Sequence, residues 1–388
     1  MKQLVHEIHV SEIRLFKKCR FAHQMKFVGM LYPKITAKPL EFGTAFHAAK
    51  QVFYDPQTNG YPADARKELA ILKFVEVCKA QEEELGSGIT IEQRMDYQER
   101  IELGMGMLEY YFGTVAPVED INYESLAVEQ TFSVPIVNPD TKEPLMCKCD
   151  RCWAKIDQTD FDEDELRTEA ARRNYWDGLP VHLEGQIDLI LRDKRTNKIW
   201  ILDWKTTARL MDKWEWLELD EQVTNYAVAL WLLGKDVAGF IYHEALKTFP
   251  KPPSRNKSKR MGRWYSVDKN QDTDYDMYVD EISLGDAEGL ESGAYDEFLD
   301  WLRDNGKPFY HRETIRRNNE QLAIAYKDLY DTAREMVNPL KVIYPSPGKF
   351  NCTYCEFLQV CIGRATGADY QYTIDTMFEQ KAPYYERR

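Results

Sequence analysis

The stretch that decides the fold runs from His182 to Thr207, HLEGQIDLILRDKRTNKIWILDWKTT. Apolar residues fill most of its two halves, and the polar segment Asp193–Asn197 between them is typical of a tight turn. The stretch therefore predicts two adjacent strands joined as a β-hairpin.

Two acids and one lysine interrupt this apolar hairpin. Residues two apart on a strand share a face, so Asp203 and Lys205 are expected on one side and Trp204 on the other. Pairing of the strands brings Asp188 close to Asp203. A buried charge is costly unless it is paired or binds a metal. Carboxylate oxygens suit Mg²⁺ or Mn²⁺, which activate water and stabilise charge on a phosphoryl group, and the lysine can position that water. The hairpin thus indicates a metal-dependent hydrolase; the alternative is an exposed Asp–Lys pair of little energetic weight.

Composition sets the broad class of the protein. The 388 residues are 44% hydrophobic and 30% charged, as in globular proteins, and the net charge of −13 argues against a general nucleic-acid coat protein. No apolar run approaches the roughly 20 residues of a membrane helix, and the N-terminus lacks the features of a signal peptide. A cytoplasmic, reduced protein is expected, in which the 8 cysteines are better candidates for metal ligands than for disulfides.

Three further side chains could belong to the site. His47, within the segment EFGTAFHAAK (41–50) that predicts a turn running into a helix, is either a packed histidine or a third metal ligand. Gln222 and Tyr226 stand four apart on one face of a helix predicted over 217–233. They can reach a substrate phosphate or base, or they can cap the edge of the core.

Other segments carry weaker signals. Glu129 lies in a strand predicted over 124–136 and is expected to face solvent, with an approach to the acidic cluster as the alternative. Segment 251–263, KPPSRNKSKRMGR, predicts a flexible basic loop that is either merely solvated or able to clamp a nucleic-acid backbone. Helices are predicted over 64–86 and 91–112, and an exposed loop or short helix over 157–177.

The cysteines fall into two groups. Cys147, Cys149 and Cys152 occupy one six-residue segment, which permits a small zinc site with Cys78 or His182 as fourth ligand, or simply reduced cysteines.

The second group lies in the tail, where the pair Cys352-x₂-Cys355 is followed by Cys361. This spacing permits zinc or an iron–sulfur cluster but leaves the fourth ligand to a distant segment. Cys19, in a helix predicted to begin after an N-cap at Ser11, is by itself typical of a buried core residue.

Taken together, these residues resemble the PD-(D/E)XK nuclease superfamily, and within it the RecB-like branch. The resemblance covers the family's N-terminal metal-ligand histidine, its G-x-x-D and D-x-K motifs, and its Q-x-x-x-Y helix. The matching residues in chain order are His47, Asp188, Asp203, Lys205, Gln222 and Tyr226. Cys19, Cys352, Cys355 and Cys361 are similar to the split arrangement that binds a 4Fe–4S cluster in AddB-type subunits and CRISPR-adaptation nucleases.

The resemblance implies an α/β fold with a restriction-endonuclease-like core, in which a central mixed sheet is flanked by helices. One nuclease domain would span 1–388, with a helical insertion at 51–115, a catalytic core at 120–317, and a C-terminal helix and iron–sulfur tail at 318–388.

It also implies metal-dependent cleavage of DNA, more often as an exonuclease than as an endonuclease, on single strands or single-stranded ends. Asp188, Asp203 and His47 would hold Mg²⁺ or Mn²⁺, Lys205 would aid the attacking water, and Gln222 with Tyr226 would steady the nucleic acid or Lys205.

Partners and alternatives remain open at this point. No G-x-x-x-x-G-K-[ST] motif occurs, so a helicase or recombination protein that works with this chain would be a separate polypeptide. Replication, recombination or repair in a bacterial or phage-infected cell is the expected setting. The alternatives are a non-catalytic DNA-binding or assembly subunit with the same fold, and a zinc module on an unrelated hydrolase.

Overall fold

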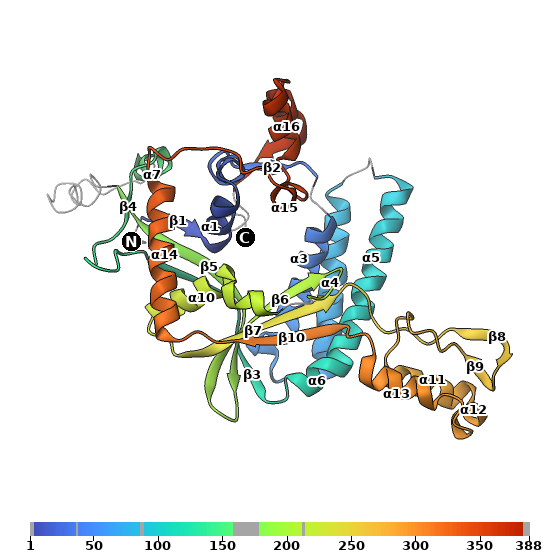
Figure 1. Ribbon diagram of the computed structural model, residues 1–388. Helices are drawn as coiled ribbons and strands as arrows, with labels where there is room; N and C mark the ends of the chain where they lie inside the picture. Colours follow the sequence, from blue (N-terminus) through green and yellow to red (C-terminus); the bar gives the residue numbers. More distant parts are fainter. Residues whose placement is uncertain (1–3, 36–37, 86–88, 158–177, 212–213, 383–388) are drawn as a thin grey trace.

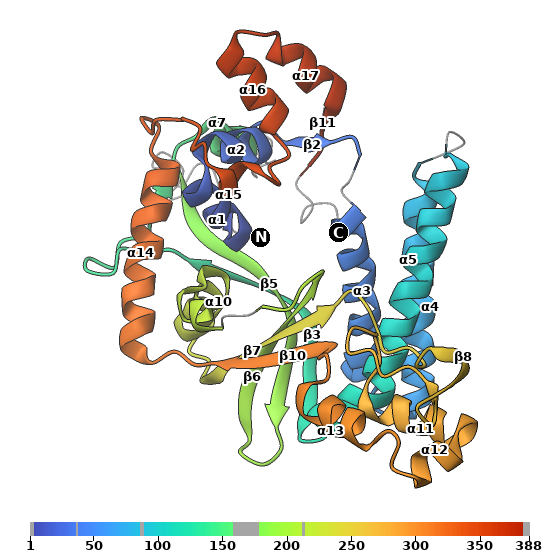
Figure 2. The same cartoon turned by 45° about the vertical axis from the view of Figure 1, so that its right-hand side comes forward.

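The computed structural model describes residues 4–35, 38–85, 89–157, 178–211 and 214–382. The predicted break at 86–88 and almost all of the predicted 157–177 segment lie outside these ranges. The fold is α/β, with a central mixed sheet between layers of helices, as expected (Figures 1 and 2). The strands of the sheet are β1 (His6–His9), β3 (Tyr123–Pro135), β4 (Met146–Cys147), β5 (Leu179–Asp193), β6 (Lys198–Thr207), β7 (Val237–Leu246) and β10 (Tyr310–Ile315).

The predicted hairpin is confirmed as β5 and β6, which pair antiparallel. In its turn, Asn197 adopts a left-handed φ of 56°, and the Arg195 amide donates to the Asp193 carboxylate at 2.8 Å. Short side-chain-to-backbone hydrogen bonds such as the one between Arg195 and Asp193 are why Asp and Asn are favoured in turns. After the turn, β6 runs parallel to β7, and β7 runs antiparallel to β10.

The long strand β5 has different partners on its two edges. β3 pairs with it from residue 182 to residue 193, and β4 pairs with residues 179–180. β1 pairs with residues 181–184 and β6 with residues 189–193, and both must share the other edge. On that edge no described strand pairs with residues 185–188, the segment that contains G-x-x-D.

Two cores lie on opposite faces of the sheet. One is covered by α1 (Val10–Lys18), α10 (Glu221–Leu232) and α14 (Asn319–Val337), and the other by α3 (Lys38–Tyr54), α4 (Ala63–Glu83) and α5 (Ile91–Tyr110) (Figures 1 and 2). Trp204 is buried in the second core, so its predicted orientation away from Asp203 is confirmed. The expected turn before His47 is wrong, because α3 is already helical from Lys38.

The first helix differs from the prediction. α1 begins at Val10 after an N-cap at His9, not after Ser11, and the His9 amide donates to the Glu12 carboxylate at 3.5 Å. α1 ends at Cys19, whose backbone is extended, before α2 (Arg20–His23), a π-helical segment (Gln24–Val28) and β2 (Leu31–Pro33). An extended residue cannot continue a helix, so Cys19 sits at a break in the chain direction.

A small unit lies to one side of the sheet (Figure 1). It contains β8 (Arg255–Arg260), β9 (Arg263–Tyr265), α11 (Tyr275–Gly285), α12 (Ala287–Glu291) and α13 (Asp296–Asn305), and it has its own core around Tyr278, Tyr295 and Phe298. The predicted flexible basic loop is therefore a hairpin. Met261 and Gly262, both at positive φ, form its turn.

The C-terminal tail folds back on the N-terminal region. It comprises α15 (Lys349–Cys352), α16 (Leu358–Thr366), α17 (Tyr370–Met377) and β11 (Phe378–Gln380), and β11 pairs antiparallel with β2. The remaining helical elements are Pro56–Thr58, Tyr111–Val115, α6 (Ala116–Glu119), α7 (Asp150–Asp157) and Glu215–Leu219. Among the described helices, none has the length and apolar character needed to cross a membrane.

Candidate active site where two strands separate

β5 and β6 separate directly after the pair Leu189–Leu202. Beyond that pair, the Trp204 amide of β6 donates to the Asp188 carboxylate at 3.0 Å. A side-chain oxygen of β5 thus accepts the hydrogen bond that a backbone carbonyl would accept in a regular pair of strands. Three residues before Asp188, Gly185 lets two rings pack close to β5, because a Cβ there would lie 2.5 Å from the Phe132 ring and 3.1 Å from Tyr226. The glycine of G-x-x-D is therefore explained by close packing.

His47 reaches the separated strands from helix α3. Its Nδ1 lies 3.4 Å from Asp188 Oδ2, and its ring stands edge-on to Trp204 at 6.1 Å between centroids. The His47 side chain keeps 28% of its surface exposed. The histidine is thus packed on one side and accessible on the other, which is compatible with both alternatives drawn from the sequence.

Glu129 joins this pair, and the expectation that it faces solvent is wrong. It is half-buried, and one of its carboxylate oxygens lies within 4.8 Å of ligand atoms of both His47 and Asp188. Its neighbours in β3 pair with Ile187 and Leu189, which puts Glu129 opposite Asp188, at a φ of 48°. A left-handed backbone costs a non-glycine residue roughly 1–2 kcal/mol, and such strain is often found at functional sites.

The second acid lies on the opposite side, against helix α10. Asp203 is only 4% exposed, and its Oδ2 lies 2.6 Å from the Lys205 ammonium. Gln222 donates to Asp203 Oδ1 at 3.2 Å and its Nε2 lies 3.3 Å from the Tyr226 hydroxyl. The pattern Q-x-x-x-Y thus places an amide that fixes one carboxylate oxygen while the lysine fixes the other.

The charges in this group are coupled. Burial raises the pKa of Asp203, and Lys205 opposes that rise. Burial also acts to lower the pKa of Lys205, but the charges of Asp203 and Asp188 outweigh it and raise that pKa. Lys205 therefore stays protonated. Burial and the Asp203 charge raise the pKa of Tyr226, which stays neutral and able to exchange hydrogen bonds.

The sequence-predicted residues of the two acidic motifs, the histidine and the Q-x-x-x-Y helix thus meet at one place. Helices on both faces of the sheet contribute because the two strands part between them. His47, Asp188, Asp203 and Glu129 supply one imidazole nitrogen and carboxylate oxygens, a donor set that suits a hard divalent cation such as Mg²⁺ or Mn²⁺.

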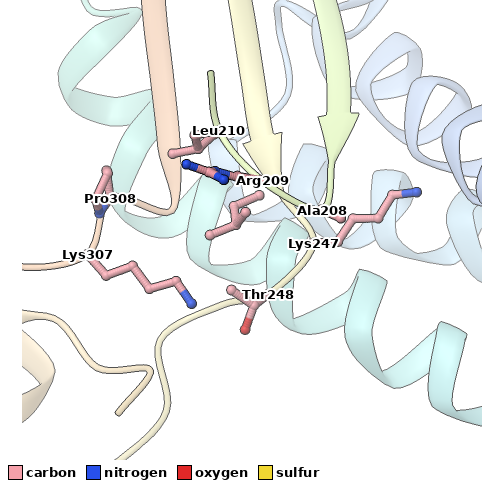
Figure 3. A pocket seen from close by; sticks show the side chains of 8 residues that line it. Ala208, Arg209, Leu210, Lys247, Thr248, Lys307 and Pro308 are labelled. Atoms are coloured by element: carbon pink, nitrogen blue, oxygen red, sulfur yellow. The ribbon is translucent and has the colours of Figure 1, made fainter. Parts of the chain in front are cut away.

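A pocket of about 400 Å³ opens just beyond the ends of β6 and β7 (Figure 3). Its lining includes Arg209, Lys247, Thr248 and Lys307. Arg209 follows Lys205 by four residues. The recess thus lies beyond the end of β6, the strand that carries Asp203 and Lys205, and one of its three basic side chains, Lys307, is paired with Asp272 at 2.5 Å.

The two cysteine groups have separate places. Cys147, Cys149 and Cys152 gather with His6, and all four ligand atoms lie within 4.8 Å of one another. The predicted fourth ligands are wrong. Cys78 belongs to α4 and is buried in the core, and His182 Nδ1 pairs with the Ser133 hydroxyl at 2.9 Å.

The second group joins three distant segments at the tail. Cys19, Cys355 and Cys361 pack against the same small core as Phe21 and Phe357. Backbone amides point at two of the sulfurs: Ser346 donates to Cys19 at 3.4 Å and Gly348 to Cys352 at 3.5 Å. Burial raises the pKa of the Cys361 thiol, and the nearby Cys19, Cys355 and Cys352 raise it further.

Comparison with known proteins adds an independent finding. The sequence model of the PD-(D/E)XK nuclease superfamily matches residues 7–362, which include every residue of the candidate site and all eight cysteines. Among curated proteins, no significant match to this chain was found.

Proposed function

Because this chain belongs to the PD-(D/E)XK nuclease superfamily, we propose that it is a Mg²⁺- or Mn²⁺-dependent deoxyribonuclease that degrades single-stranded DNA or single-stranded ends, chiefly as an exonuclease. Membership of the superfamily by itself supports a metal-dependent nuclease. The observation that carries the proposal is the meeting of Asp188, Asp203, Lys205 and His47 where β5 and β6 separate.

The metal would be held by Asp188, Asp203 and His47. Ligand atoms of His47, Asp188 and Glu129 lie within 4.8 Å of one another, and Asp203, bound by Lys205 and Gln222, stands outside that group as the next carboxylate. These residues fit the ion because the ligand atoms they offer are a nitrogen and carboxylate oxygens. Once bound, such an ion lowers the pKa of water and stabilises charge on the phosphoryl group.

The protein's own groups would do the remaining work. Lys205 is held by Asp203 at 2.6 Å and stays protonated, so its ammonium can orient water or offset charge on the scissile phosphate. Gln222 fixes Asp203 and is itself next to the Tyr226 hydroxyl, and both are placed to steady the lysine–carboxylate pair or a nearby phosphate.

Nucleic acid would approach over the basic pocket. Arg209, Lys247 and Lys307 line it next to the strand ends, and phosphate contacts from such residues position a strand without reading its sequence. This recess supports a backbone path into the site despite the overall charge of −13.

We also propose that Cys19, Cys352, Cys355 and Cys361 hold a 4Fe–4S cluster. Among the described residues, no three of these sulfurs lie within 4.8 Å of one another, whereas a single zinc ion would draw its sulfurs to about 3.8 Å. Wider spacing suits a cluster, and amide donors to the sulfurs are typical of such sites. The cluster would fix α15 and α16 to the end of α1.

The nuclease proposal is tested with end-labelled linear and circular single-stranded DNA and with blunt duplex DNA, in Mg²⁺ or Mn²⁺. Wild-type protein is compared with Asp203→Asn, Lys205→Ala and the control Glu124→Gln, an exposed carboxylate at the far end of β3. We expect wild type and the Glu124→Gln control to cleave linear single-stranded DNA, and we expect Asp203→Asn and Lys205→Ala not to cleave it. Activity that survives both site substitutions overturns the proposal, and DNA binding without turnover in any metal favours an assembly subunit.

The cluster is tested by iron and acid-labile sulfide analysis of protein purified without oxygen. About four iron atoms per chain and a brown colour are expected, both lost in Cys352→Ser and kept in Cys78→Ser. Zinc in place of iron at these cysteines would refute the cluster.

A further inference from the structure

A second group of candidate metal ligands lies at the start of β5, away from the strand separation. His6 belongs to β1, Cys147 to β4 and Cys152 to the first turn of α7, with Cys149 in the connection between β4 and α7. His6 Nδ1 lies 3.2 Å from Cys152 Sγ and 3.9 Å from Cys149 Sγ, and the last two sulfurs are 3.5 Å apart.

These distances match one ion better than a packed group of thiols. A tetrahedral zinc ion with Zn–S bonds of about 2.3 Å holds its sulfurs about 3.8 Å apart, close to the spacing observed. The Cys152 amide donates to the Cys149 carbonyl at 2.9 Å, which gives the C-x₂-C segment the tight turn that lets both sulfurs face one point. Cys147 and Cys152 are buried, at 1% and 0% exposure, and His6 and Cys149 are half-buried, so the group lies mostly inside the protein.

We infer that His6, Cys147, Cys149 and Cys152 form a closed Cys₃His zinc site with a structural role. Four protein ligands fill the coordination of zinc, which distinguishes such a site from a catalytic one that keeps an open position. The site shares no residue with the proposed catalytic site or with the tail cysteines, so it can be tested separately from both.

The position of the site indicates what the zinc would hold together. Cys147 pairs with Leu179 at the start of β5, and His6 pairs with Val181 two residues later. A metal that links residue 6 to residue 147 closes a very long loop, and such a link removes much of the freedom of the unfolded chain.

The link also supports the geometry of the strand separation. β1 is a four-residue strand whose last residue, His9, pairs with Glu184. Directly after it comes segment 185–188, which pairs with β3 on its other edge. So short an edge strand adds little stability by pairing alone. The zinc would keep β1 in register on β5 and so prevent that edge from shifting next to Asp188.

A disulfide is the chief competitor. The Cys149 and Cys152 sulfurs are 3.5 Å apart, against about 2.05 Å in a disulfide, and both cysteines are free thiols in this structure. Oxidation would join these two sulfurs and leave His6 and Cys147 without a shared ligand.

The test uses full-length wild-type protein first. We expect about one zinc per chain, and X-ray absorption at the zinc edge should show three sulfurs near 2.3 Å and one nitrogen near 2.0 Å. A thiol-specific reagent should release this zinc and lower the melting temperature. Less than a tenth of an equivalent of zinc, an oxygen-rich shell, or a Cys149–Cys152 disulfide in freshly purified protein overturns the inference.

Variants then locate the ion. Cys149→Ser and His6→Ala should lose the zinc, His6→Cys should retain it in a four-sulfur shell, and Cys78→Ser and Cys352→Ser should leave it unchanged. Zinc retained by both Cys149→Ser and His6→Ala would place the ion elsewhere and refute the assignment. Because the readouts are zinc content and melting temperature, a failure of the nuclease proposal does not affect them.

Discussion

The Asp188 carboxylate accepts the Trp204 backbone amide at 3.0 Å, at the point where their two strands stop pairing. One carboxylate oxygen thereby replaces a strand in the ladder while it also lies 3.4 Å from His47. The residue therefore has a structural bond and a proposed metal bond, and these two roles can be separated by substitution.

Asp188→Asn should retain the fold and lose activity. The amide oxygen of asparagine can still accept the Trp204 amide, but the charge needed for a cation is gone. We expect cleavage to fall at least about 100-fold with little change in melting temperature. Asp188→Leu should lose the hydrogen bond as well and become less stable by about 1–3 kcal/mol, because the Trp204 amide is left unsatisfied. Equal stability of the two variants would show that the bond to Trp204 has no structural weight.

Lys205→Met should make stability depend on pH. Burial raises the pKa of Asp203 above its ordinary 3.8, and Lys205 is the cation that opposes the rise. Without it, folded Asp203 binds its proton more tightly than the unfolded chain does, so stability falls as pH rises above about 4. At pH 7 the loss should be about 2 kcal/mol, less than for a fully buried pair because the Lys205 side chain is 33% exposed.

Thermal melting from about pH 4 to pH 8, with a chelator present, measures this effect. The gap between wild type and Lys205→Met should widen with pH, whereas Lys205→Arg, which keeps the charge, should show a small gap throughout. A gap that is the same at every pH would mean that Lys205 does not compensate Asp203.

Tyr226→Phe separates packing from hydrogen bonding. The ring packs against Phe132 and Phe240, and phenylalanine keeps those contacts, so stability should change by about 1 kcal/mol or less. We expect kcat to fall about tenfold with KM nearly unchanged, since the hydroxyl acts through Gln222 on Asp203. Gln222→Ala should reduce kcat by a similar factor, and the double variant should reduce it by little more, because both groups act through the same series of hydrogen bonds to Asp203. If the losses of activation free energy in the two single variants simply add in the double variant, the two groups act separately.

The hairpin that carries the site was predictable because its signals are local. Strand alternation placed Asp203 and Lys205 on one side and Trp204 on the other, and the polar Asp193–Asn197 segment marked the turn. The Q-x-x-x-Y spacing likewise put Gln222 and Tyr226 on one helix face, which the structure turns toward Asp203.

Features that depend on distant pairing were missed. Nothing in the sequence around His6 indicated a metal ligand, because the cysteines it joins begin 141 residues later at Cys147. Only the parallel pairing of β1 with β5 brings His6 and these cysteines together. Glu129 looked like one of many exposed glutamates, because its left-handed backbone and its place opposite Asp188 are properties of the folded sheet. The helix start at His9 was missed because Glu12 bonds its amide, while Ser11 had the more usual capping side chain.

Glu129 offers a test of whether its strain serves the site. Glu129→Gln should lower activity about 10–100-fold and shift half-maximal activity to higher Mg²⁺ or Mn²⁺, because one carboxylate near the proposed ion is lost. Glu129→Gly should lose the same activity yet gain stability of about 1 kcal/mol, since glycine adopts the φ of 48° without strain. Wild-type metal dependence in both variants would remove Glu129 from the site.

The basic hairpin β8–β9 should contribute to DNA binding without affecting the chemistry. Lys257 and Arg260 are exposed on it, so the double variant Lys257→Ala/Arg260→Ala should fold normally. If they contact phosphates, the Kd for single-stranded DNA should rise about tenfold near physiological salt, and the slope of log K against log salt should shrink by about 1 to 2. kcat at saturating DNA should not change.

The control Lys235→Ala/Lys327→Ala removes two exposed charges elsewhere and should leave the slope unaltered. An equal change in Kd and salt slope in both double variants would mean that the hairpin affects DNA binding only through the net charge of the protein. Direct contact with phosphate would instead depend on where the lysine and arginine side chains lie.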